Sequence, residues 1–346
     1  MNGIDTLLAR PALPRPGARI GLLAHAASRT LTGEHTAEAL ARRNDWILTR
    51  LFSPEHGFFG RGAAGEHIDS SRHPVLQLPI HSLYGEHRTP PPEWLQDLDW
   101  LVTDLQDLGV RCYTYASTLQ NVLLTAAQSG CPVCVLDRPT PLAGIRDGPT
   151  LDPSLHSFVG QIDLPLVYGL SQGPLARHLQ QSDPRLRGLD LTVIPAQPHP
   201  DTPWHPPSPA IPNPASARLY PLTVWSEAIP NVSVDRGTPR SFQIWAMPDL
   251  NPAPLAASLA LEGLDIQATQ SRENWPALLF TLNGKPYFPL RNAVRLLAAL
   301  RDQLGAARLF RHPEARPEFF DQLMGNASVR QALEQGTPPG AILASF

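Results

Sequence analysis

Trp100-Leu-Val-Thr103, a helical pattern from Thr114 to Ser129, and the apolar run Pro132-Val-Cys-Val-Leu136 together decide the fold class. A strand, a helix and a second strand in this order form a βαβ unit, whose two strands run parallel. The run at residues 132–136 is continuously apolar, which indicates a strand buried on both faces. This stretch therefore predicts a parallel sheet with crossover helices.

The same alternation continues on both sides of this unit. Toward the N-terminus we expect strands at Arg19–Leu23 and Trp46–Phe52, a helix at Thr36–Arg43 and an extended piece at Leu78–Tyr84. Toward the C-terminus we expect helices at Ser171–Gln180, Leu255–Leu261 and Leu290–Leu304 and strands at Leu189–Ile194, Phe242–Ala246 and Leu264–Thr269. The pattern predicts an α/β protein.

Chain length and proline content bear on the domain organisation. With 346 residues the chain is long enough for two domains, each with a buried core. The 39 prolines are densest between Pro195 and Pro221, where we expect an extended loop, because proline lacks the backbone N–H that helices and central strands use. We predict a parallel-sheet domain at residues 1–160 and a smaller α/β domain at residues 161–346 that closes a cleft.

Composition argues against several classes of function. The net charge is −3 and the basic residues are scattered, so nothing indicates a surface for nucleic acid. No apolar run approaches the roughly 20 residues of a membrane span, and no signal-peptide pattern is present, so we expect a cytoplasmic protein that binds no membrane. Cys131-Pro-Val-Cys134 has redox-motif spacing but begins an apolar strand, which predicts buried thiols.

Polar residues follow each of the five predicted strands of the first domain. In chain order these strand ends are His25, Ser53-Pro-Glu-His-Gly57, Tyr84-Gly-Glu86, Asp104-Leu-Gln-Asp107 and Asp137-Arg138-Pro139. The carboxyl ends of parallel strands share one edge of the sheet, and open α/β sheets bind their ligands there. Five polar strand ends in register therefore predict a functional site at this edge.

The segment Ser53-Pro-Glu-His-Gly57 contains the strongest candidate catalytic group. Proline fixes φ directly before Glu55, glycine frees the backbone two residues after it, and an apolar strand precedes the turn. Such a turn holds a carboxylate rigidly at the edge of the sheet. A cap on a helix or loop is the structural alternative for Glu55.

A second segment combines groups that suit a sugar or another polyhydroxy ligand. Two carboxylates, an arginine and two tyrosines surround one strand-to-helix junction, at Asp104, Asp107, Arg111, Tyr113 and Tyr115. Carboxylates accept hydrogen bonds from hydroxyl groups, and aromatic faces pack against apolar surfaces. An ion pair between Asp107 and Arg111 is the structural alternative.

Three further patterns leave other kinds of site open. Gly169-Leu-Ser171-Gln-Gly173 matches the nucleophile elbow of serine hydrolases, with a helix cap at Ser171 as the structural alternative. Gly60-Arg-Gly62-Ala-Ala-Gly65 matches a dinucleotide-binding fingerprint, but it opens no helix, which favours a glycine-rich loop. Five histidines, together with Asp104 and Asp107, provide ligand types for a metal site, although none are spaced as in zinc proteases: His56, His67, His73, His81 and His87.

Many of these motifs, in this order, resemble the bacterial exo-β-N-acetylmuramidase family. In the first half the matching stretches are Leu51-Phe-Ser-Pro-Glu-His-Gly57, Ala64-Gly-Glu66, Ser82-Leu-Tyr-Gly-Glu86, Asp104-Leu-Gln-Asp-Leu-Gly-Val-Arg-Cys-Tyr-Thr-Tyr115, Asp137-Arg-Pro139, Gly148-Pro149, Leu151-Asp152 and Ser157-Phe-Val-Gly160. In the second half they are Pro207-Ser-Pro209, Tyr220-Pro221, Glu227, Asn231-Val-Ser233, Arg236-Gly-Thr238 and Phe320-Asp-Gln-Leu323. The resemblance spans nearly the whole chain.

The resemblance implies a Rossmann-like parallel-sheet domain with a second, smaller α/β domain. It also implies a glycosidase that releases N-acetylmuramic acid from the non-reducing ends of peptidoglycan fragments, without a nicotinamide, another cofactor or a metal. The partner of the protein is then a small, muramic-acid-containing carbohydrate. The catalytic glutamate of the family falls on Glu55, which the residue pattern also selects.

Glycoside hydrolysis needs a general acid and a second group that serves the anomeric carbon or a water molecule. We predict that Glu55 is the acid. Four further carboxylates are candidates for the second group or for recognition of the sugar hydroxyls, namely Glu66, Asp104, Asp107 and Glu227. The residues expected to bind the sugar are His25, His56, Tyr84, Arg111, Tyr113, Tyr115, Asp137, Arg138, Tyr168, Glu227, Asn231 and Arg236.

The chain also departs from the family pattern at polar positions. Ala24-His-Ala-Ala-Ser28 replaces Thr-Asn-Gln-Thr-Gly, Tyr168 replaces a histidine, Ala210 replaces an asparagine, and a Lys- and Gly-containing segment is rewritten near Arg272–Ala277. Each lost hydrogen-bond partner typically costs about 1–3 kcal/mol, which is enough to change specificity. Three alternatives to a muramidase therefore remain: a sugar-binding protein without catalysis, an enzyme of altered specificity, and a serine esterase or amidase at Ser171.

Overall fold

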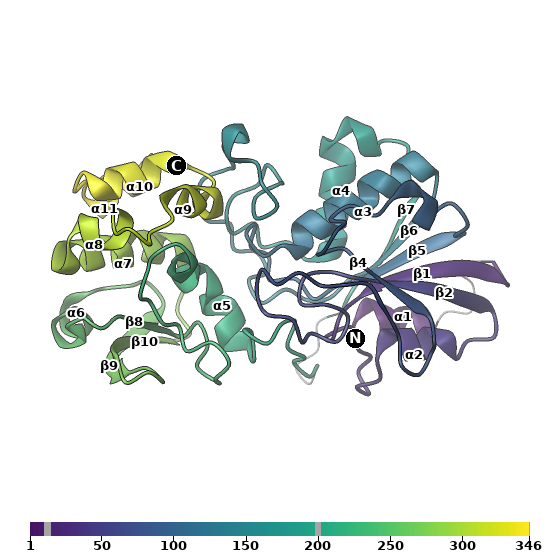
Figure 1. Ribbon diagram of the computed structural model, residues 1–346, viewed down its shortest axis with the longest axis horizontal. Helices are drawn as coiled ribbons and strands as arrows, with labels where there is room; N and C mark the ends of the chain where they lie inside the picture. Colours follow the sequence, from purple (N-terminus) through teal and green to yellow (C-terminus); the bar gives the residue numbers. More distant parts are fainter. Residues whose placement is uncertain (10–14, 198–201, 346) are drawn as a thin grey trace. The chain divides into compact units, whose positions relative to one another are not determined.

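The structure is a computed structural model that describes residues 1–9, 15–197 and 202–345. The chain forms two compact units, each assembled from three stretches of sequence (Figure 1). The first unit comprises Met1–Gly109, Tyr113–Ala143 and Leu170–Pro209, and the second comprises Val110–Cys112, Gly144–Gly169 and Ala210–Phe346.

A seven-stranded sheet forms the centre of the first unit. Its strands in spatial order are β3 (Ser71–Arg72), β4 (Pro79–Ser82), β2 (Trp46–Ser53), β1 (Ala18–Ala24), β5 (Trp100–Asp104), β6 (Val133–Leu136) and β7 (Leu191–Ile194). β3 is antiparallel to β4, and every other neighbouring pair is parallel. Numbered along the chain, the parallel strands follow the order 3-2-1-4-5-6 of the Rossmann fold. The predicted α/β class with a Rossmann-like domain is confirmed.

Helices of the first unit alternate with its strands, as the sequence pattern predicts. They are α1 (Gly3–Leu8), α2 (Thr36–Ala41), α3 (Tyr115–Ser129) and α4 (Gln172–Ser182), with two short 3-10 turns at Pro92–Trp94 and Pro184–Leu186. α3 ends at Gly130, whose φ of 66° is a left-handed conformation that glycine adopts without strain. α3 connects β5 to β6 along the chain, and most of its residues are buried, as expected for a crossover helix that packs on a sheet.

The strand order of the first sheet reverses between β1 and β5. These strands pair in parallel, from Ile20 opposite Trp100 to Ala24 opposite Asp104. In open sheets of this topology, ligands bind beyond the carboxyl ends of the strands at such a reversal. The segments that begin at His25 and at Leu105 therefore lie where a site is expected.

The second unit contains a three-stranded antiparallel sheet in the order β8 (Ile244–Ala246), β10 (Pro276–Leu282) and β9 (Leu264–Gln270). Its helices are α5 (Pro214–Thr223), α6 (Pro252–Ser258), α7 (Pro289–Leu304), α8 (Ala306–Phe310), α9 (Pro317–Met324), α10 (Ala327–Glu334) and α11 (Pro339–Leu343), with 3-10 turns at Pro153–Leu155 and Val224–Glu227. The buried carboxylate of Asp147 accepts from the N–H of Leu290 at 2.8 Å and thereby fixes the start of α7.

Six helices and strands of the second unit were not predicted, namely α5, β10, α8, α9, α10 and α11. α5 begins inside the proline-dense segment, where Pro214 occupies the first helical turn and Asn213 caps it by accepting from the N–H of Ser216 at 2.9 Å. β10 was not predicted, although Asn283-Gly284 directly after it is a turn signal, because its run starts with a proline and lacks strict alternation of apolar and polar residues. Residues 198–201 of the proline-dense segment lie outside the described residues.

The two units do not divide at residue 160, where the sequence placed the domain boundary. β7 pairs with β6 from Val133 opposite Leu191 to Leu136 opposite Ile194, so α4 and β7 belong to the first unit. Gly144–Gly169, in contrast, belongs to the second unit. The division follows strand pairing between distant residues, which no local sequence pattern records.

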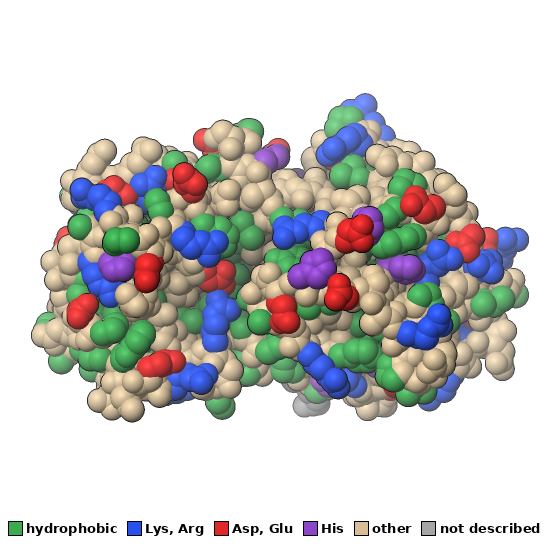
Figure 2. Space-filling model, in the orientation of Figure 1, with side chains coloured by type: hydrophobic (Ala, Val, Ile, Leu, Met, Phe, Trp, Pro, Cys, Tyr) green, Lys and Arg blue, Asp and Glu red, His purple; other side chains and the backbone are tan. Residues whose placement is uncertain are grey.

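Charged side chains are mixed on the surface. Figure 2 shows acidic and basic groups interspersed over the face that it displays, with no extended region of one sign. This distribution agrees with a sequence that has 28 basic and 31 acidic residues. Among the described residues, no helix has both the length and the apolar character needed to cross a lipid bilayer.

Candidate active site

Glu55 lies in a four-residue turn directly after β2. The N–H of Gly57 closes the turn by donating to the carbonyl of Pro54 at 3.0 Å. His56 has a φ of 69° and Gly57 a φ of 74°, so two successive residues adopt the left-handed conformation, which is strained at the histidine. The sequence predicted a rigid turn here, and Glu55 sits in it with 7% of its surface exposed.

Both carboxylate oxygens of Glu55 accept hydrogen bonds. The hydroxyl of Thr114 donates to Oε2 at 2.6 Å, and the backbone N–H of Gly65 donates to Oε1 at 2.8 Å. Thr114 directly precedes α3, whereas Gly65 belongs to the loop that follows the turn. Donors from two separate segments fix the orientation of the carboxylate before any ligand binds.

The loop after the turn folds back toward Glu55. Nδ1 of His56 lies 2.9 Å from the carbonyl oxygen of Gly62, which holds the loop close to the turn. Gly65 has a φ of 75° and open space where a Cβ would stand, so its backbone conformation rather than crowding requires glycine. The segment that matches a dinucleotide fingerprint is thus a loop that opens no helix.

His25 follows β1 and connects it to two other segments. The N–H of Gln106 donates to Nε2 at 2.9 Å, so Nε2 is an acceptor and the ring proton lies on Nδ1, which is 3.2 Å from the carbonyl oxygen of Pro207. Burial, together with the nearby charge of Arg138, lowers the pKa of His25 well below its usual value. The imidazole is therefore neutral and ties together the loops that begin after β1 and β5.

Tyr115, in the first turn of α3, supports the backbone beneath Glu55. Its hydroxyl donates to the carbonyl of Pro207 at 2.8 Å and lies 3.3 Å from the carbonyl oxygen of Glu55. The ring of Tyr113 packs edge-on against it, with the ring centroids 4.7 Å apart. Burial raises the pKa of both phenols far above the usual range, so both hydroxyls remain protonated and available as donors.

Asp104, at the end of β5, forms a buried ion pair with Arg138. The guanidinium donates from Nε to Oδ1 at 2.5 Å and from Nη2 to Oδ2 at 2.9 Å, and the hydroxyl of Thr36 also donates to Oδ2. Asp104 is 0% exposed and Arg138 is 3% exposed. A carboxylate enclosed in this way is poorly placed to touch a substrate, so we assign the pair to positioning the ends of β5 and β6.

The two other candidate carboxylates of the first unit differ in exposure. Asp107 is 2% exposed, and its oxygens accept from the N–H of Leu108 at 2.7 Å and from the side-chain amide of Gln172 at 2.9 Å. Glu66 is exposed, and one of its oxygens accepts from the N–H of Ala63 at 2.6 Å. Of the two, Glu66 presents a carboxylate that an incoming sugar can reach.

Ser171 donates its hydroxyl proton to a carboxylate rather than to an imidazole. Its Oγ lies 2.9 Å from Oδ2 of Asp137, whose other oxygen accepts from the N–H of Gly173 at 2.9 Å. Asp137 and not the Ser171 side chain therefore caps α4, which corrects the expected cap. Burial raises the pKa of Asp137. A serine hydrolase places an imidazole beside its nucleophile, so this geometry gives the esterase alternative no support.

The histidines between residues 56 and 87 take part in separate interactions. His73 accepts from two backbone N–H groups of the following turn, His81 stacks on Trp94 with centroids 4.2 Å apart, and His67 lies 3.1 Å from Asp69. Within the part of the chain that the structure describes, no group of three or more His, Cys, Asp or Glu side chains could hold a metal ion. The geometry of these residues does not favour a metal site.

Several of the predicted sugar-binding residues belong to the second unit, including Arg111. Its buried guanidinium donates to the carbonyls of Pro149, Leu164 and Met324 at 3.2, 2.6 and 2.6 Å. Burial lowers the pKa of Arg111 to about 10. A guanidinium that binds three backbone carbonyls organises the surrounding loops of the second unit.

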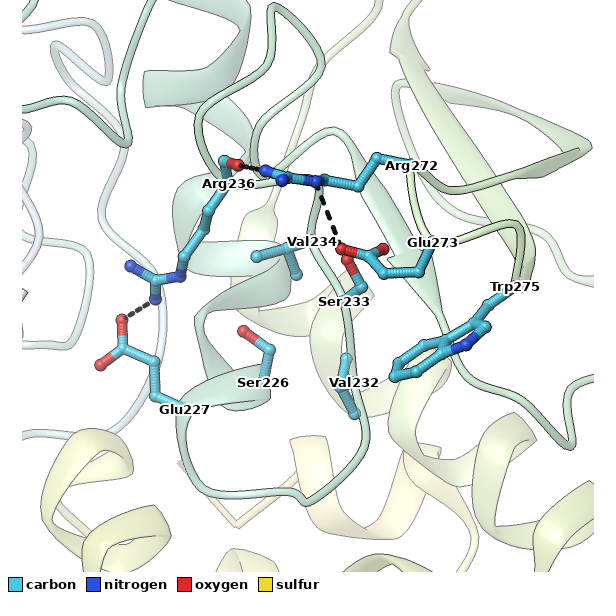
Figure 3. A pocket seen from close by; sticks show the side chains of 9 residues that line it. All are labelled: Ser226, Glu227, Val232, Ser233, Val234, Arg236, Arg272, Glu273 and Trp275. Atoms are coloured by element: carbon cyan, nitrogen blue, oxygen red, sulfur yellow. Dashed lines mark hydrogen bonds and ion pairs between the residues drawn. The ribbon is translucent and has the colours of Figure 1, made fainter.

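Glu227 and Arg236 form an ion pair in the second unit, with 2.5 Å between Nη2 and Oε1. They line a pocket of about 310 Å³, shown in Figure 3, to which Trp275 also contributes. Asn231 is exposed, has a φ of 56°, and lies next to the lining residue Val232. The second unit therefore has a polar pocket lined by two of the predicted residues, with a third next to its lining in the chain.

Two further predicted sugar-binding tyrosines are buried. Tyr84 follows β4, is 8% exposed, and lies under the guanidinium of Arg88, 4.8 Å from the ring centroid. Tyr168 is 5% exposed, in the second unit. Both side chains present little surface to a ligand.

In the first unit the structure brings His25, His56, Tyr113 and Tyr115 around the Glu55 turn. Sequence reasoning missed Thr114, which touches the carboxylate itself. Its position before a predicted helix marked Thr114 as a residue with a specific hydrogen bond, but the expected partner was a backbone N–H in the first turn of that helix. The structure shows no such cap, because the hydroxyl donates to Glu55 instead.

Comparison with known proteins gives matches over the whole chain. The family models for the N-terminal and C-terminal parts of exo-β-N-acetylmuramidase NamZ match residues 20–215 and 218–346. Peptidoglycan β-N-acetylmuramidase NamZ from Bacillus subtilis (strain 168) is 32% identical over 370 aligned residues, which cover 100% of this chain and 87% of that protein.

Solved structures agree with this match. Two DUF1343 family proteins from Bacteroides fragilis NCTC 9343 are similar to this chain, one with a TM-score of 0.85 and 26% identity over 97% of this chain and 92% of its own. The other has a TM-score of 0.76 and 25% identity, over 100% of this chain and 94% of its own. The chain belongs to the exo-β-N-acetylmuramidase NamZ family.

Proposed function

We propose that this protein is a glycoside hydrolase that releases N-acetylmuramic acid from the non-reducing ends of peptidoglycan fragments, with Glu55 as its general acid. Membership in the family supports the reaction class. The observation in the structure that supports the assignment best is the Glu55 carboxylate, which Thr114 and Gly65 orient at the carboxyl end of β2.

The two donors to Glu55 act differently on its proton. The backbone N–H of Gly65 can only donate, so Oε1 is held as an acceptor. The hydroxyl of Thr114 can donate or accept, so it can bind Oε2 both with and without a proton. We therefore place the transferable proton on Oε2, from which it passes to the leaving oxygen of the glycosidic bond.

The second catalytic group has to reach the anomeric carbon or a water molecule beside it. Asp104 is enclosed by Arg138 and Thr36, which makes it a positioning residue in this scheme. We assign the second role to Glu66, because its exposed carboxylate directly follows Gly65, the residue that binds Glu55.

We also propose the cytoplasm as the place of action and a small saccharide as the partner. Cys112, Cys131 and Cys134 are free and buried, which a reducing compartment favours. Burial raises the pKa of Cys131 to about 11 and that of Cys134 to about 12, so neither is a reactive thiolate near neutral pH.

The test is release of a chromogenic aglycone from a β-N-acetylmuramic acid glycoside by the wild type and by Glu55→Gln. We expect turnover by the wild type and a loss of about 10²–10⁴-fold in kcat for the variant, because glutamine cannot transfer a proton. Thermal unfolding of the variant should match that of the wild type. Equal turnover by both proteins would refute the role of Glu55, and no turnover by either would refute the proposed substrate.

A further inference from the structure

The second unit has a pocket whose lining unites an aromatic side chain with charged groups of both signs. Figure 3 shows Glu227 and Arg236 on one side of the 232–234 segment and Glu273 and Trp275 on the other. The pocket encloses about 310 Å³, which is at the small end for ligand sites and suits one ring rather than a chain. Glu273 and Trp275 belong to the segment that departs from the family pattern.

Hydrogen bonds tie the two walls of this pocket together. The guanidinium of Arg272 donates to the carbonyl of Arg236 at 2.8 Å, and the backbone N–H of Arg272 donates to the buried carboxylate of Asp235 at 3.0 Å. Glu273 accepts from the hydroxyl of Ser271 at 2.9 Å. Because the two bonds of Arg272 connect the 232–236 segment to the 272–275 turn, the pocket needs little reordering to bind a ligand.

The backbone beside the pocket adopts the left-handed conformation at three positions. Asn231, Asp235 and Asn274 have φ values of 56°, 53° and 61°, and each is the chain neighbour of a lining residue. Asn and Asp adopt this conformation more readily than other residues with a side chain, so these turns form at little cost in backbone energy. They place turns of the chain beside both walls of the pocket.

The charges of the pocket select for a neutral ligand with many hydroxyl groups. Two guanidinium groups face two carboxylates, with Arg236 bound to Glu227 and Nε of Arg272 3.5 Å from Glu273, so the formal charges cancel. The lining offers both hydrogen-bond donors and acceptors, while Trp275 is partly exposed and packs against the cluster of Ile244, Ala246 and Ala277. Hydroxyl groups bridge such charged pairs, and the apolar face of a pyranose packs on an indole.

We propose that this pocket binds the neutral pyranose ring of N-acetylglucosamine. The identity of the sugar rests on the proposed function, because N-acetylglucosamine is the uncharged ring of peptidoglycan. Trp275 stacks on the ring, and Arg272 and Glu273 bind its hydroxyl groups. The carboxylate of N-acetylmuramic acid would have to compete with Glu227 and Glu273 for the two guanidinium groups, so the site prefers the neutral sugar.

Fluorine NMR of the full chain labelled with 5-fluorotryptophan tests this directly. The chain has seven tryptophans, and the resonance that disappears in Trp275→Phe belongs to Trp275. We expect N-acetylglucosamine to shift this resonance saturably, and to do so at lower concentration than N-acetylmuramic acid. An unmoved resonance up to about 100 mM sugar, where even very weak binding would register, overturns the proposal, as does a shift by N-acetylmuramic acid alone.

Variants supply the matched control. We expect Trp275→Ala and Arg272→Ala each to weaken N-acetylglucosamine binding, measured by calorimetry, about tenfold or more. Arg295→Ala breaks an ion pair of similar exposure with Glu262, outside the pocket, and should leave binding unchanged. Equal binding by Arg272→Ala and Arg295→Ala, with the Trp275 resonance unaffected, would place the sugar elsewhere.

The two proposals fail separately, because the fluorine signal needs no turnover. Aglycone release that depends on Glu55, together with an unmoved Trp275 resonance, would overturn the pocket and leave the muramidase assignment standing. A saturable Trp275 shift without any aglycone release would support the pocket and overturn the muramidase assignment.

Discussion

At the scale of single residues, the hydroxyl of Thr114 orients the carboxylate of Glu55. Thr114 binds Oε2 of Glu55 at 2.6 Å and is the one side chain that we find donating to this carboxylate among the described residues. Thr114→Val keeps the shape of the side chain and removes the hydrogen bond. We expect kcat for aglycone release to fall about 10–100-fold, since a hydrogen bond to a charged group contributes about 1.5–3 kcal/mol.

Thr118→Val is the matched control for this prediction. Thr118 lies one turn further along α3, is buried, and its hydroxyl has no hydrogen-bond partner among the described residues. Its replacement should leave kcat within about twofold of the wild type, in line with the small effect of replacing an unpaired hydroxyl. Similar losses in both variants would show that the effect comes from packing of α3 and not from the bond to Glu55.

His25 makes the stability of the first unit depend on pH. Burial and the neighbouring Arg138 lower its folded-state pKa well below 6.5, and the rings of His35 and His56 act in the same direction. The unfolded chain therefore binds the proton more readily. The stabilisation is fully present above about pH 6.5 and is lost as the pH falls toward the folded-state pKa, by up to about 1.4 kcal/mol per pH unit.

The measurement is thermal unfolding between pH 7.5 and 5 for the wild type and His25→Asn. Asparagine can still accept from Gln106 and donate to Pro207 but does not titrate in this range. We expect a shallower fall in Tm for the variant, with a residual slope from His35, whose pKa burial also lowers. Parallel curves for the two proteins would rule out His25 as the titrating group.

At the scale of elements, the buried pair of Asp104 and Arg138 joins the ends of β5 and β6. Arg138→Ala leaves a fully buried carboxylate without its countercharge, so we expect the free energy of unfolding in urea to fall by about 3–5 kcal/mol. Arg42→Ala breaks the exposed pair with Glu34 and should cost less than about 1 kcal/mol. Losses of equal size would mean that Asp104 is not held by this pair in solution.

Several helices and strands were predicted correctly from local sequence patterns alone. β1, β2, β5, β6 and α3 lie within two residues of their predicted bounds, because apolar periodicity and the glycine after α3 act locally. α5 was missed because proline density argued for a loop, although proline at the first helical turn favours a helix start. The histidine cluster suggested a metal site, but His73 and His81 instead bind a turn and stack on Trp94.

At the scale of the whole molecule, the chain passes between its two units several times, so one cut does not separate them. A fragment of residues 1–160 lacks α4 and β7 and leaves β6 as an unpaired edge, whereas a fragment of residues 1–209 retains both. We expect dispersed amide resonances in NMR spectra for the strands of the longer fragment and a collapsed, poorly dispersed spectrum for the shorter one. Equal dispersion in both fragments would show that β7 is dispensable.

The sequence by itself determined the parallel-sheet class, the strands that lead to the site, and the turn that holds Glu55. These features depend on residues within a few positions of one another, such as Pro54 and Gly57 around the glutamate. Tertiary structure alone decided that Thr114 and Gly65 bind this carboxylate, that Arg138 encloses Asp104, and that β7 completes the first sheet. Such contacts join residues from ten to about sixty positions apart, beyond the reach of any local pattern of residues.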